Sequence, residues 1–183
     1  MGVTHRPGPA AAKLNAALKE LDGVKGAVGW FETAKYADST PVAYVACIQE
    51  FGDGKIPPRP FMRPTMAAQQ QVWADLARAW SRRVIRGEVS AIAMMDRVGL
   101  QAAGDISKTI ANITTPPLSP VTIELRRRAR EGDTINGRAV GEAAQAVQSG
   151  DAPGGNAGAS ENKPLVFSGI MLATLTHTVE GGQ

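Results

Sequence analysis

The chain has 183 residues, of which 43% are hydrophobic and 20% charged, and its formal net charge at pH 7 is +3. This length and composition are typical of one globular domain with a sizeable core, and so small a net charge does not by itself predict a polyanionic partner. The single cysteine excludes an internal disulfide framework and fits a reducing compartment, and two histidines near opposite ends, His5 and His177, exclude a histidine-rich metal site. The sequence shows neither an apolar run of membrane-spanning length nor a secretory signal.

The first part of the chain predicts a helix followed by a β-hairpin. Residues 1–9 form a flexible lead, and apolar residues at helical spacing predict a helix over 10–21 that ends at Gly23. Alternation over 24–31 predicts a strand whose glycines weaken it or admit a close neighbour. The β-prone run 42–48 predicts a second strand, paired with the first in a long antiparallel hairpin.

The middle of the chain predicts a stiff ribbon and two long helices. Prolines make 55–63 extended and non-helical, because each proline fixes its own φ and disfavours helix at the residue before it. Apolar stripes at helical spacing predict one helix that begins near Met66 and ends at Gly87, and another over 89–112. The short connector between them favours an antiparallel helix pair.

The last part of the chain combines a helix, a glycine-rich segment and a strand. Ser119 as N-cap and Pro120 at the first helical position predict a helix over 121–130. Residues 131–162 are rich in glycine and alanine, which predicts a flexible arm that includes at most a short, weak helix. Alternation over 173–179 predicts a final strand.

Together these elements predict an α+β fold. Its antiparallel sheet is built from the long hairpin and the C-terminal strand, and packs against the N-terminal helix and the two long helices. The predicted organisation is a flexible lead at 1–9, a main domain at 10–130, a Gly/Ala-rich insertion or arm at 131–162, and a C-terminal segment at 163–183 that returns to the main domain.

No set of residues in the sequence supplies a catalytic site, a cofactor site or a metal site. Cys47 lies in the predicted strand 42–48 and is interpreted as a buried structural thiol. His177 is interpreted as a surface or interface residue rather than a general base. The segment 52–55 resembles a phosphate loop only superficially, because it lacks the required spacing and leads into prolines. We therefore expect a protein that is not an enzyme and that carries no cofactor.

Two basic clusters are stronger functional signals. The first lies at the end of a predicted long helix, where cations favour the helix dipole, and consists of Arg82, Arg83 and Arg86. The second lies at the end of the predicted helix 121–130 and has more arginines than stabilisation of a helix end requires. It consists of Arg126, Arg127, Arg128 and Arg130. Three interpretations remain open for both clusters: a solvated helix face, contact with acidic protein partners, or contact with a nucleic-acid backbone. No aromatic interleaving or known nucleic-acid motif accompanies them.

The proline-rich ribbon and the residues beside it are predicted to form a subunit interface. A rigid extended segment loses little entropy on docking, which favours such a role. The predicted interface residues are Phe51, Ile56, Pro57, Pro58, Arg59, Pro60, Phe61 and Arg63. On this interpretation, alanine at both Arg59 and Phe61 leaves the monomer folded. The alternative is that the ribbon only connects the hairpin to the helix and is pinned over the core by Phe61.

Three segments resemble a known family. Glu50-Phe51-Gly52, followed by the run from Ile56 to Pro64, resembles the "E-F-G … I-P-x-R-P-F-x-R-P" signature of small tail-component proteins of long-tailed bacteriophages. The segment 118–123 resembles their "sP-x-T-I-x-x-R" motif, and 163–171 resembles their "K-P-L-v-d-T-G-x-m" motif. The proteins concerned belong to the neck or tail-completion group.

The resemblance implies a structural virion protein that forms a ring, a hexamer or a dodecamer, at the head–tail junction. Its implied partners are further copies of itself, the head connector and the tail terminator or tube proteins, with DNA passing through the channel without sequence specificity and with no membrane contact. The protein is then made in the host cytoplasm and resides at the neck of the virion. A tail terminator that caps the tail tube is the nearest alternative, and a small nucleic-acid-binding accessory protein is an alternative from another class.

Overall fold

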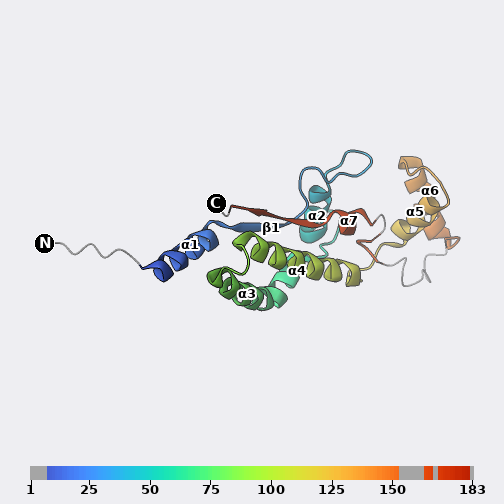
Figure 1. Cartoon of the computed structure of the whole chain (residues 1–183). Helices are drawn as coiled ribbons and strands as arrows, with labels where there is room; N and C mark the ends of the chain where they lie inside the picture. Colours follow the sequence, from blue (N-terminus) through green and yellow to red (C-terminus); the bar gives the residue numbers. More distant parts are fainter. Residues whose placement is uncertain (1–7, 153–162, 167–168, 182–183) are drawn as a thin grey trace.

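The protein contains seven helices and a two-stranded sheet in the part that the structure describes. The structure is a computed structural model that describes residues 8–152, 163–166 and 169–181 (Figure 1). The elements, in chain order, are α1 (Pro9–Gly23), β1 (Lys25–Gly29), α2 (Val42–Phe51), α3 (Met62–Arg86), α4 (Ala91–Asn112), α5 (Pro120–Arg130), α6 (Gly137–Ser149), α7 (Ile170–Thr174) and β2 (Thr176–Glu180). The α+β class is therefore confirmed at this coarse level.

The sheet pairs the two ends of the chain. β1 and β2 are antiparallel, in a register that sets Lys25 opposite Glu180 and Gly29 opposite Thr176. The predicted long hairpin between 24–31 and 42–48 is wrong, because the partner of the first strand is the C-terminal strand. Figure 1 shows the sheet lying along α4.

The predicted strand 42–48 is also wrong, since these residues belong to helix α2. Val42, Ala46 and Glu50 are its buried residues, and they recur every four positions, which is a helical period. The β-branched and aromatic residues of this run favour a strand, but local preference is weak where tertiary contacts compete with it. Here the buried stripe of α2 joins the core around Phe61 and Ile110.

The two long helices form a pair that turns back on itself, as predicted (Figure 1). Gly87 ends α3 in the left-handed conformation with φ 75°, and the side chain of Ser90 accepts the N–H of Ala93 to begin α4. A polar link joins the two helices, because the indole of Trp73 donates to Asp105 at 3.0 Å.

Two clusters of buried side chains hold these elements together. One lies where α2, α4, α7 and the start of α3 meet, and it includes Val42, Phe61, Ile106, Ile110 and Met171. The other lies where α1 meets the α3–α4 turn, and it consists of Ala17, Val24, Val84, Ala91 and Met94. Trp30 reaches the first cluster, where its indole N–H donates to the carbonyl of Met171 at 2.8 Å.

Helices α5 and α6 pack against each other at one end of the molecule (Figure 1). The predicted N-cap of α5 is confirmed, since Ser119 accepts the N–H of Thr122. Within the predicted Gly/Ala-rich insertion, residues 137–149 form helix α6, while 153–162 lie outside the described residues. Most of the predicted N-terminal lead, residues 1–7, also lies outside them. None of the described helices is both long and apolar enough to cross a membrane.

The sheet approaches α4 closely at a glycine, which gives a direct test of this packing. A Cβ at Gly99 would lie 2.6 Å from the His177 ring and 3.0 Å from the His177 Cβ, so that turning the ring alone cannot relieve the clash. We expect Gly99→Ala to lower the free energy of unfolding by about 2 kcal/mol, as measured by urea denaturation.

Gly104 on the same helix is the matched control for Gly99. It is exposed, and a Cβ there would meet nothing within 4 Å. Because alanine is the better helix former, Gly104→Ala should stabilise the protein by about 0.5–1 kcal/mol. Equal effects of the two substitutions would contradict the packing of β2 on α4.

Candidate subunit interface

Glu50 organises the segment from Glu50 to Pro64. Its carboxylate accepts the backbone N–H groups of Phe61 and Met62 at 2.6 and 2.9 Å and that of Arg63 at 3.2 Å. These groups are free donors at the N-terminus of α3, where the helix has no capping side chain of its own. Glu50 therefore caps α3 from α2.

Arg63 completes this arrangement. Its guanidinium donates to the Glu50 carboxylate at 2.9 Å and to the Glu50 carbonyl at 3.0 Å, and it lies 4.7 Å from the centre of the Phe51 ring. Burial alone would raise the pKa of Glu50, but Arg63 and the three backbone N–H groups together hold that pKa below its usual range.

The structure buries two of the predicted interface residues inside the subunit. Phe61 is fully buried and makes an edge-to-face contact with Trp30, with ring centres 5.7 Å apart. Arg59 is 5% exposed, and it donates to the carbonyls of Pro116 and Pro117 at 2.8 and 3.1 Å. The prediction that the Phe61 side chain contacts a neighbouring subunit is therefore wrong, whereas Arg59 packs within the chain and still lines a groove.

Other residues of the predicted interface are at the surface. Phe51 is 62% exposed and Ile56 is half-buried. The remaining exposed members are Pro57, Pro58, Pro60 and Arg63. The ribbon thus presents prolines outward, while Arg59 and Phe61 anchor it to the body.

The outer face of α2 is apolar and open to solvent. Tyr44 is 60% exposed, and Tyr44, Cys47 and Phe51 follow one another at helical spacing along this face. Beside it lies an apolar groove of about 280 Å³, lined by residues that include Trp30, Cys47, Phe51 and Met62. The interpretation of Cys47 as a buried thiol is wrong, since the helix places it on this outer face.

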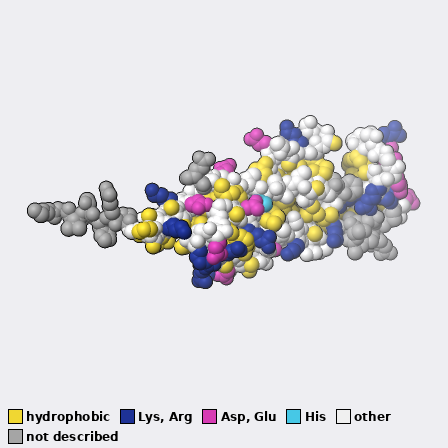
Figure 2. Space-filling view, viewed as in Figure 1, with side chains coloured by type: hydrophobic (Ala, Val, Ile, Leu, Met, Phe, Trp, Pro, Cys, Tyr) yellow, Lys and Arg dark blue, Asp and Glu magenta, His cyan; other side chains and the backbone are white. Residues whose placement is uncertain are grey.

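A second apolar groove lies next to the first. It has a volume of about 260 Å³ and lies where β1, α3 and α4 meet, with Met62, Met66, Trp73 and Met95 in its walls. Met62 lines both grooves, so the two adjoin at this side chain. Figure 2 shows hydrophobic side chains gathered over α2 and α4, whereas Lys and Arg gather over α3. We call the outer face of α2 and these two grooves the apolar surface.

The first arginine cluster is partly neutralised by one carboxylate. Arg83 and Arg86 both pair with Glu88 just after α3, and Arg83 also stacks on the ring of Trp80. Arg82 is exposed on the same turn. This arrangement fits helix-end stabilisation and local pairing better than a continuous basic track.

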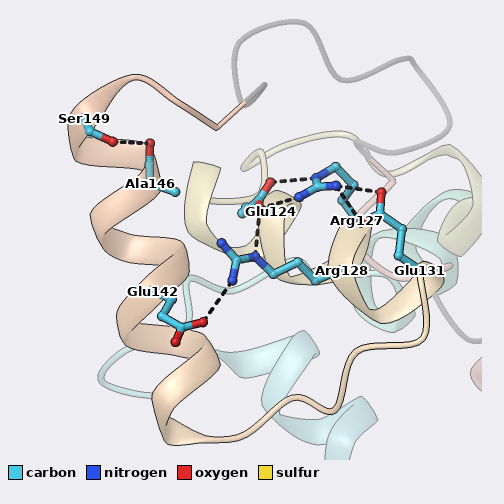
Figure 3. Close-up of polar contacts among 7 residues, drawn as sticks. All are labelled: Glu124, Arg127, Arg128, Glu131, Glu142, Ala146 and Ser149. Carbon is cyan, nitrogen blue, oxygen red and sulfur yellow. Dashed lines mark hydrogen bonds and ion pairs between the residues drawn. The ribbon is translucent and has the colours of Figure 1, made fainter.

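The second cluster is bound within the chain (Figure 3). Arg127 and Arg128 converge on Glu124, each with an N–O distance of 2.8 Å, and Glu124 is only 2% exposed. Hydrogen bonds from these two arginines lower the pKa of Glu124 to about 2. Arg128 also reaches Glu142, which ties α5 to α6.

Arg126 differs from its neighbours because it binds the C-terminal segment. It donates to the carbonyls of Lys163 and Pro164 at 3.0 and 2.7 Å. Arg130 is exposed and has an interaction of its own. The side chains of this cluster therefore bind within the subunit, which leaves few of their N–H donors for a nucleic-acid backbone.

The described residues form no metal-binding cluster, and they keep Cys47 apart from His177. No group of three or more His, Cys, Asp or Glu side chains lies within metal-binding reach in that part of the chain. His177 lies on β2, where its Nε2 is 2.8 Å from Asp96, while His5 is outside the described ranges. Cys47 and His177 are therefore on separate elements, each with its own surroundings.

Sequence reasoning missed the roles of Glu50 and Tyr44. Glu50 is a carboxylate in a mostly apolar run, and it lies eleven residues before Phe61, the N-cap position of a helix that has no capping side chain. This combination was a usable signal for its role. Tyr44 was missed because its run was assigned to a strand. Comparison with protein-family models, with curated proteins and with solved structures found no match for this chain.

Proposed function

We propose that this chain is a structural virion protein of a tailed bacteriophage, which forms a ring at the head–tail junction and joins the tail to the DNA-filled head. The observation that carries the proposal is the apolar surface on α2 and along the adjoining grooves. Contiguous apolar surface of this kind marks contact sites in soluble proteins. The motif resemblance supports the phage setting, since its first signature coincides with the segment beside this surface.

A ring requires two different patches that meet between neighbouring copies. The apolar surface supplies one of them, and Tyr44 and Phe51 stand at its edge as aromatic side chains of the kind that dominate interface energetics. The exposed prolines of the ribbon lie next to Phe51 and present a backbone that needs little ordering on contact.

The nucleic-acid alternative finds less support. Arg127 and Arg128 pair with Glu124, and Arg126 donates to backbone carbonyls, so the second cluster has few N–H donors left for phosphates. The experiment below separates the joining role from the tail-terminator role.

We expect the double substitution Tyr44→Glu with Phe51→Glu to abolish assembly and leave the monomer folded, because both side chains are mostly exposed. The test is negative-stain microscopy of lysates from a phage that lacks this gene, complemented with each variant. The matched control is Ile135→Glu with Val140→Glu, which charges two exposed apolar residues near α6.

The outcomes separate the candidate roles. DNA-filled heads beside free tails of normal length establish joining, while overlong tails establish the terminator. Intact infectious particles without the gene overturn both roles. Full assembly by the Tyr44/Phe51 variant refutes the apolar surface as the interface.

A further inference from the structure

A groove of about 480 Å³ runs between the ribbon and the start of α5. Its charged lining residues are Lys55, Arg59 and Arg126, and none of the described residues in its walls carries a negative charge. Apolar walls flank these cations, among them Pro57 and Leu118. We call it the cationic groove.

Arg59 is the unusual member of this groove. Its guanidinium is almost fully buried, yet its acceptors within the described residues are neutral: two backbone carbonyls and, at 3.5 Å, the amide oxygen of Gln49. Buried charges in proteins are as a rule paired, because dipoles offset only part of the cost of leaving water. A guanidinium has five N–H donors, so Arg59 has donors left over for an anion.

Neighbouring cations lie close enough to Arg126 to act on its guanidinium. Burial lowers the pKa of Arg59, and burial together with the charges of Arg130 and Arg59 lowers the pKa of Arg126. Lys55 is exposed at the mouth of the groove, where its ammonium group can turn toward an entering ligand.

The shape of the groove selects among anions. A phosphate on a DNA duplex cannot reach a guanidinium that is 5% exposed behind proline walls, and Arg127 and Arg128 offer no continuing basic track. An extended peptide can lay apolar residues on the proline walls and direct a carboxylate inward, where an arginine binds carboxylates with two parallel hydrogen bonds.

We propose that the cationic groove binds a carboxylate side chain on an extended peptide segment of another protein chain, with Arg59 and Lys55 as its direct partners. This inference goes beyond the assembly role. It concerns a different surface from the apolar surface, and it can be tested on the isolated protein whether or not copies form a ring.

The experiment follows backbone amide shifts of the full chain by two-dimensional NMR at constant ionic strength. The probe is a blocked hexapeptide in which glutamate and proline alternate, compared with the same peptide containing glutamine. We expect saturable shifts near Lys55–Arg59 and Leu118–Thr122 with the glutamate peptide alone. Equal binding of both peptides, or no binding of either, overturns the proposal.

Two variants test the assigned residues. Lys55→Glu should weaken binding at least about tenfold, and it should fold normally because Lys55 is exposed. Arg59→Lys retains the charge but loses the planar guanidinium group that can donate two parallel hydrogen bonds. It should also weaken binding about tenfold. Lys13→Glu makes the same charge change as Lys55→Glu on α1, at the opposite end of the molecule from α5 (Figure 1), and should leave affinity unchanged.

Competition identifies the source of the anion. The competitors are inorganic phosphate and a short DNA duplex, each at the same concentration as the glutamate peptide. If either displaces the peptide, the groove is a phosphate site and the proposal is overturned. Failure of both to compete, together with loss of binding in Lys55→Glu, supports a peptide carboxylate as the ligand. Neither result bears on the assembly defect expected from the Tyr44 and Phe51 substitutions.

Discussion

Replacing Phe61 with alanine should lower the free energy of unfolding by about 4 kcal/mol. The side chain is fully buried, packs edge-to-face on Trp30, and belongs to the cluster that includes Val42 and Ile110. Its removal loses the transfer free energy of the ring and leaves a cavity that the surrounding helices can only partly close. Urea denaturation followed by far-ultraviolet circular dichroism measures the loss, and Phe61→Leu gives a milder second variant if the alanine form does not fold.

Phe51 is the matched control for Phe61, since it is a phenylalanine of the same motif at the surface. Its ring is 62% exposed and contacts the guanidinium of Arg63. Phe51→Ala should therefore cost less than about 1 kcal/mol. A similar loss for both substitutions would contradict the assignment of Phe61 to the core and Phe51 to the surface.

This expectation reverses one drawn from the sequence. On the interface interpretation of the ribbon, alanine at both Arg59 and Phe61 leaves the monomer folded, but the structure buries both side chains. Their loss should destabilise the monomer, so an assembly defect in that double variant would not identify an interface. Tyr44 and Phe51 are better positions for that purpose, because they are exposed.

Replacing Glu50 with glutamine should lower the free energy of unfolding by about 3 kcal/mol at pH 7. The carboxylate accepts three backbone N–H groups and the Arg63 side chain, and an amide has only one oxygen to offer them. Its NH₂ group would instead face donors at the start of α3. The measurement is denaturant unfolding, with Glu32→Gln at an exposed site as the control that removes the same charge.

The effect of Glu50→Gln should depend on pH in a defined direction. The pKa of Glu50 is lowered in the folded protein, so the stability that its charge contributes is complete above the unfolded value near 4.5 and is lost as pH falls through the folded value. The difference between wild type and variant should stay constant from pH 8 to about pH 6 and shrink below about pH 4.5. A difference that grows on acidification would contradict a carboxylate cap.

The segment from Glu50 to Pro64 owes its charged and aromatic residues to structural roles in this chain. Its Glu50 and Arg63 pair across the start of α3, Arg59 anchors the ribbon, and Phe61 fills the core. The buried and paired members of the motif therefore build the joint between α2 and α3. The surface that this joint supports, with Tyr44 and Phe51, is the part available to partners.

The sequence by itself determined the helices whose patterns are long or locally capped. The two long helices follow from apolar stripes and from Gly87, while α5 follows from Ser119 and Pro120. The predicted stripes are buried only in part: Val84, Ile106 and Ile110 are buried. Met66, Val72 and Leu100 are exposed, so the period identifies each helix better than it identifies the packed face. The α+β class followed from the same patterns.

Only the tertiary structure decided which strand pairs with β1, whether residues 42–51 form a helix or a strand, and which partners the charged residues have. A run of ten residues with β-branched and aromatic side chains is compatible with the period of a strand and with that of a helix. In the fold, burial of Val42, Ala46 and Glu50 at every fourth position favours the helix. Strand pairing between Lys25 and Glu180 joins segments far apart in the chain, which no local pattern encodes. Arginines that look alike in the sequence differ in their partners. Arg127 and Arg128 pair with carboxylates, above all that of Glu124, whereas Arg59 binds two backbone carbonyls. The reason is physical, because propensity acts over a few residues while burial and charge pairing depend on what the fold brings together.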